Sequence, residues 1–213
     1  MTITYPYKSG LYVNLTNRCP CACVFCLRQY AASVTGSDSL WLEREPTAEE
    51  VCADLDARNL AGISELVFCG YGEPTERLDV LLAAARHAKG RKPDLKVRVN
   101  TNGLSDLIHG EPTAQRFKGL VDTVSISLNS PDPEEYLKLC RPTFGLKSWQ
   151  AVVDFATSCK AYVPDVVMTI VDRPVTTPEV QAECRALTDR IGVRLRIRPY
   201  EAPGGAGSAK RVA

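Results

Sequence analysis

The fold is decided by residues 11–28, which read LYVNLTNRCPCACVFCLR. The run at 11–16 predicts a strand, and four cysteines crowd into the eight residues from Cys19 to Cys26. Three of them, Cys19, Cys23 and Cys26, are spaced C-x3-C-x2-C. Such short spacings let one loop wrap an iron–sulfur cubane, because each thiolate can reach a different iron. A [4Fe–4S] cluster has four corners, so three thiolates leave one iron open to another molecule.

Beyond the cysteines, short β-branched runs alternate with longer helical stretches. Further strands are predicted at 65–69, 97–100, 123–128, 166–171 and 193–197. Helices are predicted from Thr47 to an end at Gly62, and at 78–89, 148–159 and 178–191. This alternation indicates parallel βαβ units, and the chain is too short for a closed eight-unit barrel of ~250 residues. We therefore expect an α/β fold, an open partial (β/α)6 TIM-like barrel with a parallel six-stranded sheet; a flat doubly wound sheet is the second choice.

Composition bounds the class of protein. The 213 residues are 45% hydrophobic and 24% charged with a net charge of +1, which excludes a disordered or collagen-like chain. With no basic excess, tight charge-driven binding to nucleic acid or membranes is not expected, although a local basic patch stays open. No signal peptide or apolar run of membrane-spanning length stands out, which predicts a cytoplasmic protein with no membrane partner. We expect one core domain at 1–201 and a disordered tail at 202–213.

The sequence has nine cysteines, and that odd number does not fit a secreted disulfide framework. Five stand singly in apolar segments, where we expect most of them in the core: Cys52, Cys69, Cys140, Cys159 and Cys184. Two other interpretations of the cluster stay open. Adding Cys21 would give a four-thiolate zinc site, although such sites typically draw on two separated pairs. Alternatively, the cluster is a set of inert or redox-sensing thiols.

Polar residues gather where each predicted strand ends. They are Asn14 and Thr16, Gly72 and Glu73, Asn100 and Asn102, Ser127 and Asn129, Thr169 and Asp172, and Arg198 and Tyr200. Ligands bind at the carboxyl ends of the strands in barrels and open α/β sheets. The same residue types also serve turns, but the repetition at every strand end predicts a binding site on the rim that carries the cysteines.

Two motifs resemble those of the radical S-adenosylmethionine (radical SAM) superfamily. One is the C-x3-C-x2-C loop after the first strand, with the aromatic Phe25 before the last cysteine. The other is Gly70-Tyr71-Gly72-Glu73-Pro74-Thr75 at the end of the second strand, which is similar to that superfamily's glycine–glutamate motif. Residues 17–28 and Ser125-Ile126-Ser127-Leu128-Asn129 further resemble a short subfamily associated with TatD-type nucleases. Cys21 is an addition that the superfamily pattern does not need; it could substitute for a ligand, resolve oxidation or fill space.

The resemblance implies two cofactors, a [4Fe–4S] cluster and S-adenosylmethionine (SAM). It implies Cys19, Cys23 and Cys26 as cluster ligands, and Gly70, Gly72 and Glu73 as the contacts of the methionyl amino group. It places Phe25 near the adenine. It places Asn102, Ser127 and Asn129 at the ribose hydroxyls or the methionyl carboxylate. The implied reaction is reductive cleavage of SAM to a 5′-deoxyadenosyl radical, which abstracts a hydrogen atom from the substrate.

The resemblance also implies partners. A reductant such as flavodoxin or ferredoxin would supply the electron. The sequence does not identify the substrate, which could be a macromolecule, and a large partner or a second subunit in a homodimer could close the open barrel side. Within the enzyme interpretation, the alternatives are a glycyl-radical activase, chemistry on modified purines of the 7-deazaguanine type, and action on nucleic acid or a nucleotide. The non-enzymatic alternative is an Fe–S or zinc-binding module for interaction or redox sensing.

Overall fold

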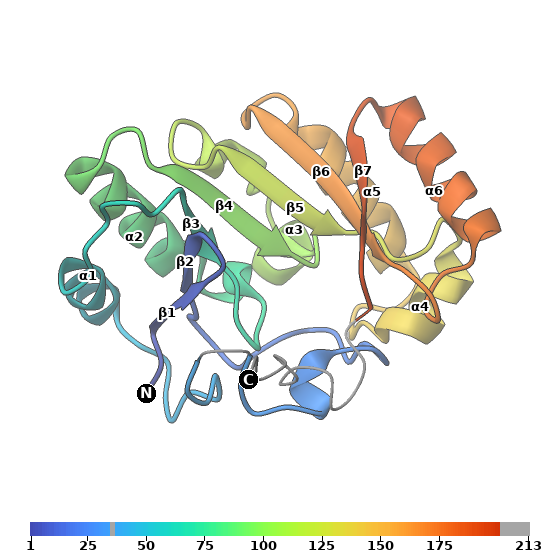
Figure 1. Cartoon of the computed structure of the whole chain (residues 1–213). Helices are drawn as coiled ribbons and strands as arrows, with labels where there is room; N and C mark the ends of the chain where they lie inside the picture. Colours follow the sequence, from blue (N-terminus) through green and yellow to red (C-terminus); the bar gives the residue numbers. More distant parts are fainter. Residues whose placement is uncertain (35–36, 201–213) are drawn as a thin grey trace, which may run out of the picture.

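The computed structural model describes residues 1–34 and 37–200, and Figure 1 shows their arrangement. In these residues one seven-stranded sheet follows the order of the chain. Its strands are β1 (Thr4–Tyr7), β2 (Gly10–Val13), β3 (Glu65–Phe68), β4 (Lys96–Thr101), β5 (Thr123–Ser127), β6 (Asp165–Val171) and β7 (Arg194–Arg198). The strands from β2 to β7 are all parallel, and β1 pairs antiparallel with β2. The predicted tail at 202–213 lies outside the described residues.

The strand order settles the choice between the two α/β architectures. Each crossover joins neighbouring strands and the order never reverses, whereas a doubly wound sheet reverses at a switch point. The edge strands β1 and β7 do not pair with each other, so the sheet stays open. The prediction of an open partial (β/α)6 barrel is confirmed, with β1 as an additional strand.

The start of the sheet differs from the prediction in two respects. The strand β1 was missed, and β2 ends at Val13 instead of reaching residue 16. Asn14, the first residue after β2, donates through its side chain to Leu40 O at 2.7 Å. Pro6 obscures β1 in the sequence, since proline is tolerated in a strand mainly at a sheet edge, which is where β1 lies.

Helices and short 3₁₀ turns connect the strands. The helices are α1 (Ala48–Asp56), α2 (Leu78–Arg91), α3 (Ser105–His109), α4 (Pro133–Cys140), α5 (Lys147–Cys159) and α6 (Pro178–Ile191). The 3₁₀ turns are η1 (Leu27–Gln29), η2 (Pro74–Arg77) and η3 (Ala114–Phe117). The predicted capping box of Thr47 and Glu50 opens α1, but this helix ends at Asp56 and not at Gly62. Gly62 instead forms a turn before β3 with φ +78°.

The two faces of the sheet differ in polarity. The helices lie along one face, and the apolar strand side chains pack against them (Figure 1). These side chains are Leu66, Phe68, Val97, Val99, Val124, Ile126, Met168 and Ile170. Because side chains alternate along a strand, the residues between them point to the inner face, where Arg98, Asn100 and Ser127 lie. The fold therefore puts its core outside the partial barrel and leaves a polar interior.

In the part of the chain that the structure describes, no helix combines the length and the apolar character required to cross a membrane.

The packing of β3 against the helices predicts a large effect of Leu66→Ala. Leu66 is fully buried, so the substitution leaves a cavity and should lower the free energy of unfolding by about 2–5 kcal/mol. The matched control is Leu146→Ala, at a side chain that is 65% exposed, which should change it by less than about 0.5 kcal/mol. Urea unfolding followed by circular dichroism measures both, and equal effects would contradict the placement of Leu66 in the core.

Candidate functional site

One cavity of about 630 Å³ lies at the carboxyl ends of the strands. Every residue predicted for the site lines it: Cys19, Cys23, Phe25, Cys26, Gly70, Gly72, Glu73, Asn102, Ser127 and Asn129. These residues come from the segments after β2, β3, β4 and β5. The chain thus brings together side chains that stand more than a hundred residues apart in the sequence.

The cysteine loop is held by its backbone against the end of α4. Ala22 N donates to Cys140 O at 3.0 Å, and Val24 N donates to Leu139 O at 2.9 Å. On the other side Thr143 N donates to Pro20 O at 2.8 Å. Main-chain hydrogen bonds on both sides therefore hold the loop in place.

Two further thiols stand beside the predicted ligands. The buried Cys21 thiol lies within hydrogen-bonding reach of the sulfurs of Cys19 and Cys23, and Cys140 lies beside Cys23. Hydrogen bonds from Cys140 and then Cys21 lower the pKa of Cys23, and the bond from Cys21 lowers the pKa of Cys19. Burial raises the pKa of Cys26. The thiolate is the form of cysteine that binds metal, so the lowered pKa values of Cys19 and Cys23 agree with their predicted role as ligands. Cys21 lies beside both sulfurs, and Cys140 lies beside that of Cys23.

Cys140 is the residue that the sequence interpretation placed incompletely. It is buried, as expected for a core cysteine, yet it also lines the cavity together with Cys69. No local pattern could reveal this, because the contact joins segments that are far apart in the sequence.

The Glu73 carboxylate is buried and closely bound. Its Oε1 accepts hydrogen bonds from Thr75 N at 3.0 Å, Thr75 Oγ1 at 2.8 Å and Thr101 Oγ1 at 2.7 Å. Its Oε2 accepts one from Asn102 N at 2.7 Å. Burial nevertheless raises the Glu73 pKa above its ordinary value. The carboxylate is thus held in one orientation, with Oε2 as its less saturated oxygen among the described residues.

Gly70 and Gly72 allow the segment after β2 to approach the turn after β3. A Cβ on Gly72 would stand 2.3 Å from Thr16 O and 2.5 Å from Arg18 O, and these are backbone atoms that cannot rotate away. A Cβ on Gly70 would stand 2.0 Å from Asn14 Oδ1. Both positions therefore require glycine for close packing.

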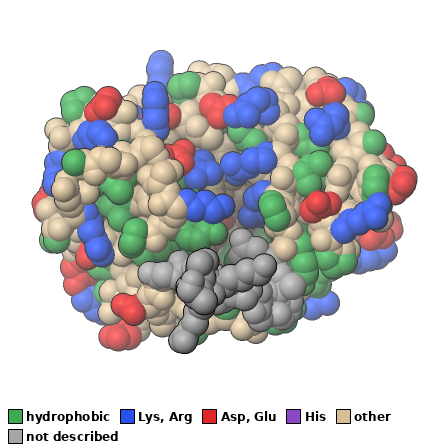
Figure 2. Space-filling model, viewed as in Figure 1, with side chains coloured by type: hydrophobic (Ala, Val, Ile, Leu, Met, Phe, Trp, Pro, Cys, Tyr) green, Lys and Arg blue, Asp and Glu red, His purple; other side chains and the backbone are tan. Residues whose placement is uncertain are grey.

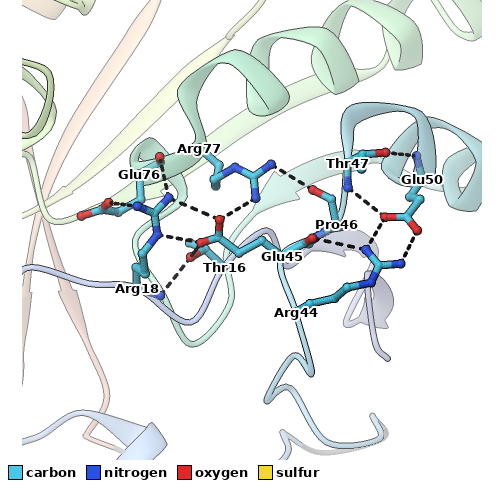
Figure 3. Close-up of polar contacts among 9 residues, drawn as sticks. All are labelled: Thr16, Arg18, Arg44, Glu45, Pro46, Thr47, Glu50, Glu76 and Arg77. Carbon is cyan, nitrogen blue, oxygen red and sulfur yellow. Dashed lines mark hydrogen bonds and ion pairs between the residues drawn. The ribbon is translucent and has the colours of Figure 1, made fainter.

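A polar network fixes the same approach from outside the cavity. Glu45 accepts from Thr16 Oγ1 at 2.5 Å, from Arg18 Nε at 2.7 Å and from Arg77 Nη1 at 2.8 Å (Figure 3). Arg18 also lies 3.4 Å from a carboxylate oxygen of Glu76. The network joins the start of the cysteine loop to η2, the turn that Glu73 caps.

The remaining predicted residues occupy the cavity wall in different ways. Asn102 Oδ1 accepts from Leu104 N at 2.9 Å, and its Nδ2 lies 3.9 Å from Cys19 Sγ. Asn129 has φ +59° and places Nδ2 3.4 Å from Cys140 Sγ, while its buried Oδ1 has no donor among the described residues. Ser127 ends β5, and Phe25 packs against the core beside the cysteines. The unsatisfied Asn129 oxygen is an acceptor that a bound molecule could use.

Four of the polar strand-end residues do not line the cavity. Asn14 and Thr16 instead hold the chain near Leu40 and Glu45. Asp172 binds the backbone of Arg173 and the side chain of Gln181. Thr169 lies inside β6, where its side chain is buried. At Asn14, Thr16 and Asp172 the polar side chain serves the local chain path, which is the alternative that turn chemistry offers.

The donor set fits a cluster and SAM. Soft thiolates suit iron–sulfur clusters and zinc alike. In the described ranges, no group of three or more His, Cys, Asp or Glu side chains is arranged around a single metal ion. A cubane is larger than one ion, and the three predicted ligands lie on a loop that opens on a cavity with room for a second molecule. The oriented Glu73 carboxylate and the unsatisfied Asn129 oxygen are polar groups that such a molecule could contact.

This combination of a partial barrel and a thiol-rich cavity at its rim defines a class of enzyme. The profile of the Radical SAM superfamily matches residues 13–186, and the chain belongs to this superfamily. Members of the superfamily are enzymes that bind a [4Fe–4S] cluster and SAM. The more specific TatD-associated subfamily stays a prediction.

Two curated relatives share part of the sequence. A probable GTP 3′,8-cyclase from Methanosarcina mazei is 31% identical over 134 residues, which cover 62% of this chain and 36% of the relative. A GTP 3′,8-cyclase from Rhizobium meliloti is 26% identical over 135 residues, which cover 62% of this chain and 35% of the relative. The matched region is thus only about a third of the length of these relatives.

Solved structures share the fold. A radical SAM methyltransferase from Sphaerobacter thermophilus superposes with a TM-score of 0.62 at 18% identity, covering 93% of this chain and 59% of the other. SuiB from Streptococcus suis, bound to S-adenosylmethionine, superposes with a TM-score of 0.63 at 15% identity, covering 92% and 41%. At these identities the likeness shows the fold.

The close approach at Gly72 predicts that Gly72→Ala is destabilising. The new Cβ must displace two backbone carbonyls, and such overpacking costs about 1–3 kcal/mol, or a fall of roughly 2–10 °C in Tm. The matched control is Gly90→Ala in α2, where a Cβ meets nothing within 4 Å and should raise Tm by a few degrees, since alanine favours helix. Calorimetry of both variants checks this, and an unchanged Tm for Gly72→Ala would contradict the close approach.

Proposed function

We propose that this chain is a radical SAM enzyme that binds a [4Fe–4S] cluster through Cys19, Cys23 and Cys26 and cleaves SAM reductively to abstract a hydrogen atom from its substrate. The observation that carries the proposal is the convergence of these three thiols and the Gly72–Glu73 turn on one cavity. When bound, the cluster and SAM supply the electron transfer and the 5′-deoxyadenosyl radical. Membership in a superfamily of enzymes supports this function over a non-enzymatic binding module.

The chain's own residues bind and orient the cofactors. Cys21 and Cys140 donate hydrogen bonds to ligand sulfurs, and such bonds tune the potential of a cluster. Oε2 of Glu73 accepts a hydrogen bond from the ammonium group of SAM. The site is buried, and a charge-assisted hydrogen bond is strong there. The backbone at Gly70 and Gly72 supports the same end of the molecule. Phe25 covers the adenine, and Asn102, Ser127 and Asn129 contact the ribose hydroxyls and the methionyl carboxylate.

The walls of the cavity also protect the reaction. Tyr71 and Tyr136 are buried and line the cavity, and core residues pack against Cys19 and Cys23. Exclusion of water matters because a radical must meet its substrate and no other hydrogen donor. An external reductant such as flavodoxin or ferredoxin supplies the electron.

A nucleotide is the substrate class that the relatives favour. The names of the two curated relatives concern GTP, and the shared region covers 62% of this chain. This supports nucleotide or purine chemistry over activation of a protein glycine. A second subunit that closes the open barrel side is a further element of the proposal.

The ligand assignment predicts the result of single cysteine substitutions. Replacing Cys19, Cys23 or Cys26 with Ala should reduce bound iron from about four atoms per chain to well below one after anaerobic reconstitution, because each removes a cluster corner. The matched control is Cys52→Ala in α1, outside the cavity, which should keep the full iron content. Cys21→Ala should keep at least part of it.

Iron and sulfide analysis with electron paramagnetic resonance measures these variants, and release of 5′-deoxyadenosine in the presence of dithionite and SAM measures function. If Cys21→Ala abolishes the cluster while Cys19→Ala keeps it, the assignment of ligands is wrong. Colourless zinc protein would favour the binding-module alternative.

The raised Glu73 pKa predicts how SAM binding depends on pH. Only the carboxylate attracts the ammonium, and a raised pKa means that Glu73 takes up its proton at a higher pH than an ordinary glutamate. Affinity for SAM should therefore fall on acidification from pH 8 towards pH 5. Glu73→Gln should bind about ten- to a hundredfold more weakly at pH 8, which corresponds to a charged hydrogen bond of about 1.5–3 kcal/mol.

The Glu73→Gln variant should also lose this part of the pH dependence. Equilibrium dialysis of labelled SAM measures both effects. The matched control is Glu76→Gln, three residues further on and outside the cavity, which should bind SAM as the unmodified protein does. Equal pH profiles of the two variants would show that Glu73 does not hold the ammonium.

A further inference from the structure

Three arginines that are not among the residues assigned to SAM line the inner wall of the same cavity. Arg98 comes from β4, and Arg196 and Arg198 come from β7. Figure 2 shows Lys and Arg side chains gathered around a hollow at the centre of this face. Strand β7 alternates Arg with Leu and Ile at 194–198, so its arginines share one face of the sheet.

The charges of these arginines are only partly balanced. Arg98 pairs with Glu65 at 2.8 Å, while its buried Nε has no partner among the described residues. Arg196 donates to Ser125 Oγ at 2.9 Å. Within residues 1–34 and 37–200, neither Arg196 nor Arg198 forms an ion pair with a carboxylate. The three guanidinium groups and Glu65 together thus carry an excess of about two positive charges.

Placing Arg98, Arg196 and Arg198 close to one another does not stabilise the folded protein. Burial lowers the pKa of Arg196, and the positive charges of Arg98 and Arg198 lower it further, which is the direction that repulsion gives. Arg194 lies on the same face of β7, but its charge is balanced, because it forms an ion pair with Asp165 at 2.7 Å. Unbalanced cations that converge in a cavity are typical of a site for a negatively charged ligand.

We propose that Arg98, Arg196 and Arg198 form the subsite that binds a phosphate group of the substrate. The inference rests on the proposed function only in taking the substrate to enter this cavity. A phosphate monoester carries about −1.5 to −2 charges at neutral pH, which matches the excess of the cluster better than a single carboxylate does. The planar guanidinium fork also pairs with phosphate oxygens in a bidentate manner.

The rest of the cavity fits the carbon part of a small molecule. Tyr12 lies between Tyr5 and Tyr7, with ring centroids 5.5 and 5.2 Å away, and its hydroxyl stands 3.4 Å from Arg98 Nη2. These tyrosines line the cavity from β1 and β2. Arg98 precedes Asn102 by four residues, so their Cα atoms are at most about 13 Å apart in extended chain. A phosphorylated compound of small size can therefore reach from the arginines to the SAM contacts.

Binding of defined probes to the anaerobically reconstituted protein tests the proposal. Isothermal titration calorimetry uses tripolyphosphate, GTP, guanosine and citrate as separate ligands. Tripolyphosphate and GTP should bind, and guanosine and citrate should bind at least tenfold more weakly. Binding of citrate as tightly as tripolyphosphate would overturn the phosphate assignment in favour of a carboxylate site, and failure of both phosphate probes to bind would overturn it altogether.

Substitutions then locate the binding. Arg196→Gln and Arg198→Gln should each weaken tripolyphosphate binding about tenfold or more, as expected for a charge-assisted contact. Arg196→Lys keeps the charge and should recover part of the affinity. The matched control Arg194→Gln, on the same face of β7 but paired with Asp165, should bind tripolyphosphate unchanged. Equal affinity of the Arg194→Gln and Arg196→Gln variants would overturn the subsite.

The same preparations separate this proposal from the proposed function. Iron content and SAM affinity should be unchanged in Arg196→Gln and Arg198→Gln. If the unmodified protein binds iron and SAM but no phosphate probe, the subsite is wrong and the radical SAM assignment stands. If it binds tripolyphosphate through these arginines but neither iron nor SAM, the subsite stands and the proposed function is wrong.

Discussion

The close approach of two backbone segments organises the whole site. The segment after β2 lies directly on the turn after β3, with Glu73 N donating to Arg18 O at 2.8 Å. Only glycine at position 72 leaves room for Thr16 O. This contact sets the position of the cysteine loop relative to the Glu73 carboxylate, and Glu45 reinforces it from outside. Cluster ligands and the candidate ammonium acceptor are therefore placed by one piece of main-chain packing.

The alternation of side chains along the strands extends this organisation into the barrel. Parallel sheets usually carry apolar side chains on both faces. Here the outer face follows that rule, while β4 turns Arg98 and Asn100 to the inside and β7 does the same with Arg196. The polar interior is stable because it lines a cavity and not a packed core. The outer face of the sheet thus provides the packed core, and the inner face lines the cavity.

The sequence predicts the elements that depend on local patterns. Strand β6 and helix α6 are found by periodicity, and Thr47 with Glu50 marks the start of α1 by its capping chemistry. The predicted site residues all line one cavity because strand ends of a parallel sheet share an edge. For these features, local sequence patterns and the topology of a parallel sheet are sufficient for a correct prediction.

Other features depend on contacts between distant segments, which no local pattern carries. Strand β1 contains Pro6, and it forms because β2 offers an unpaired edge. Cys140 resembles a core cysteine, yet its thiol lies beside Cys23 because α4 ends where the cysteine loop docks. The sequence analysis placed Arg198 at a strand end of the predicted rim, but Arg98 and Arg196 look in the sequence like ordinary charged strand residues. Only the arrangement of the sheet brings them to the same interior.

The end of α4 links these distant contacts into one unit. Asn129 follows β5 and places its amide beside the Cys140 sulfur, while the carbonyl of Cys140 accepts from the cysteine loop. A displacement of β5 would therefore reach Cys23 through two hydrogen bonds. Glu73 is tied in a similar way to β4 through Thr101 and Asn102. Since β4 also carries Arg98, the strand that orients the Glu73 carboxylate is the same strand that contributes to the proposed phosphate subsite.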